Sequence, residues 1–176
     1  HTITVTNPDG QTATSSSGIL TVTAPPATVL GRWVFYNHSA WDGNNPAANT
    51  NDDNAIAPDK AALLPGGTAT FANYTSYSRG LNGIMVDIAN LPGTPTTNDF
   101  TFRVGNDNNP DGWSNAPAPA SITERQGAGT NGSDRVTLIW NDNAIQEEWL
   151  QVTVLATANT GLASDDVFYF GNAIGE

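Results

Sequence analysis

The sequence predicts an all-β chain whose main part is an antiparallel β-sandwich of jelly-roll-like type. Three observations support this prediction. Apolar and polar residues alternate in several short segments, as in "DFTFRVG", where Phe100, Phe102 and Val104 alternate with polar neighbours. Turn sequences such as "LPGG", "NNPDG" and "GTNGSD" separate these segments. No segment shows a sustained helical period.

Each expected strand follows from this alternation. In chain order the expected strands of the main domain cover residues 30–36, 68–73, 83–89, 100–105, 120–125, 135–140, 148–155 and 167–170. Residues 55–64 are expected to hold one short helical turn. Between the first two strands lies a long irregular segment, residues 37–60, and a loop of this length in a compact domain is usually functional or held by an ion.

The sequence of the N-terminal 23 residues predicts a separate β-hairpin. Residues 2–6, "TITVT", and residues 17–23, "SGILTVT", are expected to be strands, joined through residues 7–16, "NPDGQTATSS", with a corner at "NPDG". Residues 24–28, "APPAT", are expected to be a stiff linker. The predicted organisation is therefore a hairpin over residues 1–23, a linker, and a β-sandwich over residues 29–176.

Composition excludes several classes of partner. The 176 residues carry a formal net charge of −11, with Lys60 as the single lysine and five scattered arginines. We therefore expect neither nucleic-acid binding nor attraction to an anionic membrane surface. The apolar runs are too short for membrane insertion. Cysteine is absent, which excludes disulfides and zinc-thiolate sites, and few lysines with abundant Asn, Thr, Ser and Gly favour a secreted, extracellular or cell-surface bacterial protein.

Two stretches are candidates for calcium. In "DNNPDG", residues 107–112, the side chains of Asp107, Asn109 and Asp111 alternate as in the first half of a calcium loop, but the twelfth position is Ala118 instead of an acid. A turn is therefore favoured there over a calcium site. The long segment has more oxygen ligands, and we expect structural calcium there; the alternative is an Asn-rich loop that bonds its own backbone. The expected ligands in this segment are Asp42, Asn44, Asp52, Asp53 and Asp59.

The aromatic residues divide into two groups. Trp140 and Trp149 lie within strand patterns and are expected in the core. Trp41 and Trp113 lie in polar loops, where an exposed indole can stack on the face of a sugar ring; the alternative is that each covers a sheet end. The expected polar contacts to a sugar are Tyr74, Tyr77, Arg79, Asn106 and Asp111.

Catalysis has little support. His38 is the main candidate for a base near neutral pH, and it shows no Ser-His-Asp or metal-ligand pattern. No catalytic residue is predicted.

Several long motifs, among them "FYNHSAWDGN", "FTFRVGN", "SDRVTLIW" and "DVFYFGNAIGE", resemble a recurrent β-sandwich module of large secreted bacterial proteins. That module stands near the C-terminus, often after immunoglobulin-like domains and before a dockerin-type repeat. Residues 2–23 resemble the last hairpin of a bacterial immunoglobulin-like domain. The resemblance implies secretion, neighbouring domains and a non-catalytic role, but no particular ligand.

These observations lead to one main functional hypothesis. We expect a calcium-stabilised carbohydrate-binding module that attaches a larger secreted protein to polysaccharide. The alternative is a structural or adhesive module that spaces or assembles domains, and a third hypothesis is a polysaccharide-active hydrolase or lyase.

Overall fold

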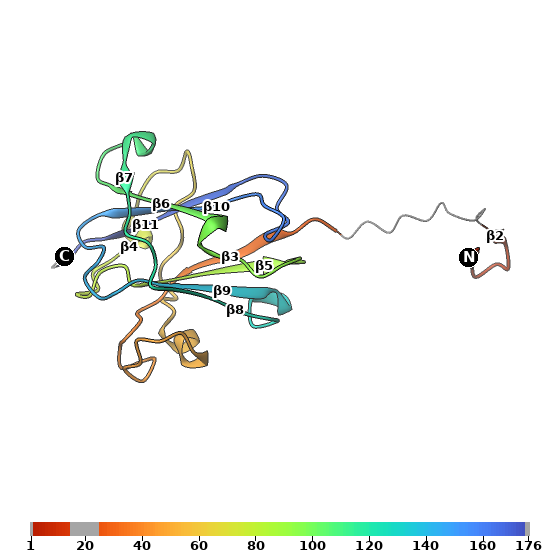
Figure 1. Cartoon of the computed structure of the whole chain (residues 1–176), viewed down its shortest axis with the longest axis horizontal. Helices are drawn as coiled ribbons and strands as arrows, with labels where there is room; N and C mark the ends of the chain where they lie inside the picture. Colours follow the sequence, from red (N-terminus) through yellow and green to blue (C-terminus); the bar gives the residue numbers. More distant parts are fainter. Residues whose placement is uncertain (1, 15–24, 175–176) are drawn as a thin grey trace.

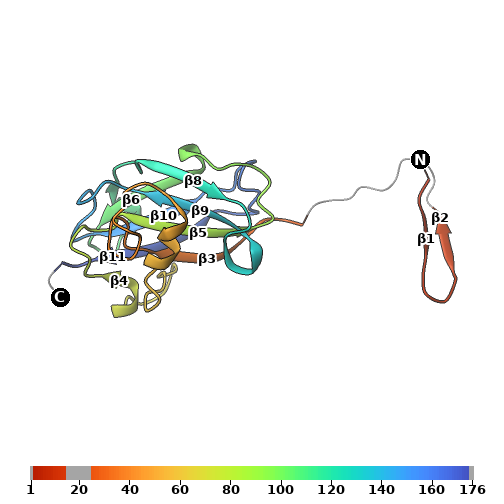
Figure 2. The same ribbon diagram turned by 90° about the horizontal axis from the view of Figure 1, so that it is seen from below.

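The computed structural model describes residues 2–14 and 25–174. Two β-sheets lie one above the other in the larger of these ranges, as Figures 1 and 2 show. This arrangement of two packed, mainly antiparallel sheets is consistent with a β-sandwich. In the part of the chain that the structure describes, no helix is long and apolar enough to cross a membrane.

The first sheet has four strands in the order β3-β5-β9-β8, and all its pairs are antiparallel. Its strands are β3 (Thr28–Val34), β5 (Gly83–Ala89), β9 (Asp134–Ile139) and β8 (Ser121–Arg125).

The second sheet has five strands in the order β4-β11-β10-β6-β7. Its strands are β4 (Tyr74–Thr75), β11 (Asp166–Asn172), β10 (Trp149–Val154), β6 (Phe100–Gly105) and β7 (Ser114–Asn115). Short β4 pairs with β11 in parallel, and the other pairs are antiparallel.

Short 3-10 turns connect these strands. They are η1 (Thr50–Ala55), η2 (Phe71–Asn73), η3 (Thr97–Asp99), η4 (Pro110–Gly112) and η5 (Thr130–Gly132). The strand expected at residues 68–73 is therefore wrong, since this stretch ends in η2 and the adjoining strand is only Tyr74–Thr75. The strands expected at 83–89 and 100–105 are confirmed with the same bounds.

The strand order differs from the jelly roll that the sequence predicted. With β4 left aside, the order is β3-β5-β9-β8 in one sheet and β11-β10-β6-β7 in the other. An immunoglobulin-type sandwich has this order, with sheets A-B-E-D and G-F-C and one strand added beside C. A jelly roll would place the first and last strands in one sheet, whereas β3 and β11 belong to different sheets.

The main core lies between the two sheets. Alternate residues of β10 and β11, including Leu150, Val152, Phe168 and Phe170, are fully buried there. Residues on the same strands between these positions, such as Gln151, are more accessible, as expected for side chains that point away from the core. The period of two therefore assigns one face of this sheet to the core and the other to a separate surface.

The long segment after β3 covers the outer face of the four-stranded sheet (orange in Figure 1). A second, smaller core forms beneath it from Phe35, Ala55, Met85 and Ile139. Because this layer covers the outer side of β5, six of the seven residues of β5 are buried.

Ion pairs hold the same segment to the sheet. The buried Asp87 carboxylate accepts hydrogen bonds from Arg135 Nε and Nη2, at 2.7 and 2.8 Å, and from Trp33 Nε1 at 2.9 Å. Arg135 Nη1 also donates to Asp53 Oδ1 at 2.8 Å, and Arg125 Nη1 donates to Asp53 Oδ2 at 3.0 Å. A carboxylate of η1 is thus tied to two arginines of the sheet.

The N-terminal hairpin forms at residues 4–14. Strand β1 (Thr4–Thr6) pairs with β2 (Thr12–Thr14), and at the turn Gly10 N–H donates to Asn7 O at 3.0 Å with φ of +86° at Gly10. The partner strand thus lies in the stretch that the sequence assigned to the connection, and the whole of the expected strand 17–23 lies in 15–24, outside the described residues. The linker prediction is wrong at its end, because Thr28 already belongs to β3 and Ala27 is buried.

Candidate functional site

A cleft of about 720 Å³ lies on the outer face of the five-stranded sheet. One wall is the segment 63–69, and the other is the loop 106–110 with Trp113. Trp149 of β10 and Tyr169 of β11 also line it. Because both side chains stand on regular strands, the scaffold fixes the direction in which each ring points.

Two glycines let the aromatic rings lie close to the sheet. Trp149 pairs with Gly105 on one side and with Gly171 on the other. A Cβ atom added to Gly105 would lie 2.4 Å from Trp113 Cδ1, and one added to Gly171 would lie 2.9 Å from Tyr74 Cβ and 3.1 Å from the ring of Trp149. The absence of side chains at these two positions therefore makes room for three aromatic residues.

The stretch "DNNPDG" forms the loop that positions Trp113. Asp107 Oδ1 accepts the backbone N–H of Asn109 and the indole N–H of Trp113, each at 2.9 Å. Arg103 Nη1 holds the other end of the loop by donating to Asp111 O at 2.6 Å. The favoured interpretation of this stretch as a turn is confirmed by η4, and its first carboxylate orients an aromatic ring.

Tyr169 connects the two walls of the cleft. Its backbone exchanges two hydrogen bonds with Leu63, at 3.0 and 2.9 Å, which attach the segment 63–69 to the sheet. Its hydroxyl accepts a hydrogen bond from Gln151 Nε2 at 2.9 Å. The ring of Trp113 meets that of Tyr169 edge to face, with centroids 5.9 Å apart. Both rings are thereby fixed before any ligand arrives.

The structure brings together only part of the predicted sugar-binding set. Trp113 and Asn106 line the cleft, and Tyr74 contacts Trp149 with ring centroids 6.5 Å apart. Asp111 is exposed beside the cleft, where its backbone oxygen accepts the bond from Arg103. The other three predicted residues, Trp41, Tyr77 and Arg79, belong to a different cluster.

Sequence reasoning missed two residues of the cleft. Trp149 was expected in the core, but it lies on the outer face, half-buried, and lines the cleft. Tyr169 was not singled out, although it stands between the buried Phe168 and Phe170. In both cases the sequence held a signal, because a residue next to a core residue on a strand points to the opposite face of the sheet. Trp140, in contrast, is 1% exposed as expected, and its indole N–H donates to Pro117 O at 2.8 Å.

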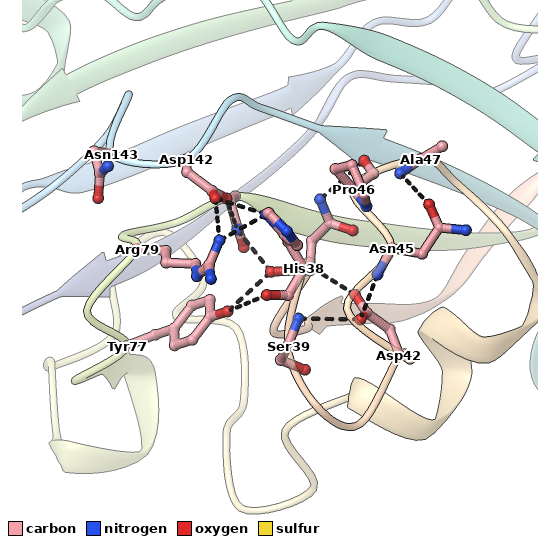
Figure 3. A network of polar contacts seen from close by, with 12 residues as sticks. His38, Ser39, Asp42, Asn45, Pro46, Ala47, Tyr77, Arg79, Asp142 and Asn143 are labelled. Atoms are coloured by element: carbon pink, nitrogen blue, oxygen red, sulfur yellow. Dashed lines mark hydrogen bonds and ion pairs between the residues drawn. The ribbon is translucent and has the colours of Figure 1, made fainter.

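The second cluster lies at the long loop after β3, and Figure 3 shows its polar residues, among them Tyr77 and Arg79. Trp41 is 63% exposed, and its ring lies 5.6 Å from that of Tyr36, which in turn lies 5.0 Å from that of Tyr77. The hydroxyl of Tyr77 donates to the backbone oxygen of Asn37 at 3.0 Å. Trp41 therefore presents an exposed aromatic ring outside the cleft.

Asp142 is the centre of the polar part of this second cluster (Figure 3). Its carboxylate contacts His38 Nδ1 at 2.8 Å, accepts from Asn82 Nδ2 at 2.9 Å and pairs with Arg79. Burial alone would raise the pKa of Asp142, but the hydrogen bonds from Asn82, His38 and Arg79 hold it below its ordinary value. These contacts join three loops, which gives His38 a structural role.

The expected calcium ligands of the long loop are engaged elsewhere. Asp42 is fully buried and accepts backbone N–H groups of Ser39 at 3.0 Å, Asn45 at 3.3 Å and His38. Asp52 accepts both the backbone and side-chain N–H groups of Asn49, at 2.9 and 3.1 Å. These contacts are those of the alternative interpretation, a loop whose side chains bond its own backbone.

The remaining expected ligands do not gather around one point. Asp53 pairs with Arg125 and Arg135, Asp59 pairs with Lys60 at 3.1 Å, and Asn44 is an exposed turn residue with φ of +57°. The Asp107 carboxylate accepts a hydrogen bond from the indole N–H of Trp113, and Asn109 lies directly before η4. Across residues 2–14 and 25–174, no three His, Cys, Asp or Glu side chains are grouped to hold a metal ion. The expected carboxylate ligands are thus engaged by groups of the protein, and calcium binding stays a prediction.

No protein-family model, curated protein or solved structure matches this chain. The resemblance to a secreted bacterial module therefore stays a prediction, and the function has to be argued from the cleft itself.

Proposed function

We propose that this chain is a non-catalytic carbohydrate-binding domain of a secreted protein, and that the cleft beside Trp113 takes the glycan. The observation that supports the proposal is the joint position of Trp113, Trp149 and Tyr169 in one cleft on a rigid sheet. An aromatic face is apolar and flat, and it can pack on the C–H face of a pyranose while its edge stays in water. Binding in this way needs little rearrangement, because the rings are already fixed.

Polar groups at the rim complement the aromatic rings. Asn106, Asp107 and Asn108 lie in the same wall as Trp113. Amides and carboxylates of this kind donate to and accept from sugar hydroxyls, and a few such groups give an apolar cleft its specificity. The combination of aromatic floor and polar rim therefore suits a sugar better than a purely apolar ligand.

The non-catalytic part of the proposal follows from the carboxylates. Glycoside hydrolysis usually needs two carboxylates on opposite sides of the scissile bond. Among the described residues that line the cleft, Asp107 is the only acid, and its Oδ1 accepts two hydrogen bonds from its own loop. A binding role is therefore favoured over a hydrolase.

Retention on polysaccharides tests the proposal. The protein is mixed with a panel of insoluble and soluble polysaccharides, and the fraction left in solution or shifted in a native gel is measured. We expect selective retention that weakens about tenfold in Trp113→Ala and in Trp149→Ala, since each removes a stacking surface. Leu30→Ala is the control, because Leu30 is an exposed apolar residue on the four-stranded sheet.

Trp41→Ala distinguishes the two aromatic sites. If the cleft is the site, this variant binds as the parent protein does. Loss of retention in Trp41→Ala alone would move the binding site to the second cluster, and no retention on any polysaccharide would overturn the proposed function.

A structural or adhesive role is the second candidate, and the hairpin is the observation that favours it. Val5 of β1 is 63% exposed there, which suits contact with a neighbouring domain. Light scattering over a range of protein concentrations tests this role. We expect a monomer at all concentrations if glycan binding is the function, and association if the hairpin assembles chains.

A further inference from the structure

The aromatic residues of the cleft belong to a longer row. We call Trp113, Tyr169, Trp149, Tyr74 and Phe71 the aromatic row. Ring centroids are 5.9 Å apart for Trp113 and Tyr169, 6.5 Å for Trp149 and Tyr74, and 5.3 Å for Tyr74 and Phe71. Trp149 and Tyr169 are diagonal neighbours on one face of the β10–β11 pair, so the two groups of rings lie on the same face of the sheet.

Phe71 extends the row beyond the cleft. It is 63% exposed, although nothing in its own short turn requires an aromatic residue. The ammonium group of Lys60 lies 3.7 Å from its ring centroid and donates to its backbone oxygen at 3.2 Å. Asn73 accepts the backbone N–H of Thr70 at 2.8 Å and so fixes the turn. The ring is therefore held in place but left open to solvent, as a contact surface would be.

The charges near the row favour an uncharged ligand. Asp107 is the only charged residue among the described residues that line the cleft. Of the cations near the row, Arg103 is held by its hydrogen bond to the backbone oxygen of Asp111, and Lys60 is paired with Asp59 and has a side chain only 5% exposed. The chain carries a net charge of −11, which repels polyanions. Among the described residues that line the cleft, no cation is present to pair with the carboxylates or sulfates of a charged glycan.

From the row and its charges we infer that the cleft binds several consecutive units of an uncharged polysaccharide chain, with Phe71 as a distal subsite. This inference rests on the proposed function and adds the ligand class and its length. A single sugar, or a chain end, would use only the rings in the cleft. A longer chain also reaches Phe71 and gains a further stacking contact.

Oligosaccharides of increasing length test this inference. The probes are one to six units of the neutral polysaccharide that retains the protein best, titrated by calorimetry. We expect Kd to fall with length and then level off. Phe71→Ala should weaken the longest probe by about fivefold and leave the shortest unchanged, since it removes one stacking contact. Trp113→Ala should weaken every probe.

Phe71→Tyr is the matched control, because it keeps the ring and should restore the length dependence. Retention on polygalacturonate, a polyanion, at low salt tests the preference for an uncharged ligand, and we expect none. A Kd that does not change with length, an unchanged Kd for the longest probe in Phe71→Ala, or stronger retention on polygalacturonate would each overturn this inference and leave the proposed function standing. Failure to bind any glycan would overturn both.

Discussion

The indole of Trp113 lies so close to Gly105 that a Cβ atom at Gly105 would come within 2.4 Å of the ring. Gly105→Ala should therefore displace Trp113 without removing any cleft residue. We expect glycan retention to fall about tenfold and the free energy of unfolding to fall by about 1–3 kcal/mol, the usual cost of overpacking. Retention assays and urea unfolding measure the two effects.

The double variant Gly105→Ala/Trp113→Ala shows whether the effect acts through Trp113. If it does, the double variant binds no more weakly than Trp113→Ala alone, because the two changes remove the same contact. Additive losses would mean that Gly105 serves the site in another way, and unchanged retention in the single variant would contradict the position of the ring.

The buried Asp87 predicts a specific loss of stability in acid. Burial by itself would raise the pKa of Asp87, but hydrogen bonds from Arg135, Trp33 and Thr130 lower it from 3.8 to about 2. The folded state thus holds this proton less tightly than the unfolded chain. The resulting stabilisation, about 2 kcal/mol, is present above about pH 4 and is lost as the pH falls toward 2.

Urea unfolding of the parent protein and of Asp87→Asn between pH 7 and pH 2 measures this contribution. At pH 7 the variant should be less stable by about 3–5 kcal/mol, because Arg135 loses a buried partner. The difference should shrink by about 2 kcal/mol between pH 4 and pH 2. Glu124→Gln, on strand β8 of the same sheet, is the control and should change little. A difference that is constant with pH would contradict the lowered pKa.

Strand positions could be predicted from the sequence because alternation is local. The segments 83–89 and 100–105 were identified with their observed bounds. Alternation does not say which strands pair, and the jelly-roll prediction depended on that information. The pairing of β3 with β5 and of β6 with β10 joins residues that are far apart in the chain.

The site could be predicted only in part for the same reason. Trp113 stood out because it lies in a polar loop. Trp149 did not, since apolar neighbours on the same strand concealed which face it occupies. The role of Gly105 depends on a side chain eight residues away that folds back over the strand, and no local pattern indicates such a contact.

The long loop after β3 gives the last prediction, which also tests calcium. Burial alone would raise the pKa of Asp53, but hydrogen bonds from Arg125 and Arg135 lower it, so the carboxylate is charged in its pairs with both arginines. Asp53→Asn should lower the free energy of unfolding by about 1–2 kcal/mol, since it weakens charged hydrogen bonds. Hydrogen exchange should rise mainly in residues 42–57, while the strands of the sandwich stay protected.

Asp59→Asn is the matched control, because the Asp59 side chain is 64% exposed and pairs with Lys60. This variant should change exchange in the loop little. Melting curves of the parent protein in calcium and in chelator complete the test. The loop carboxylates already accept backbone, amide or arginine hydrogen bonds, and a calcium ion would have to displace them. We therefore expect the same Tm in both buffers. A Tm several degrees lower in chelator, with greater exchange in residues 42–57, would instead establish a calcium site in this loop.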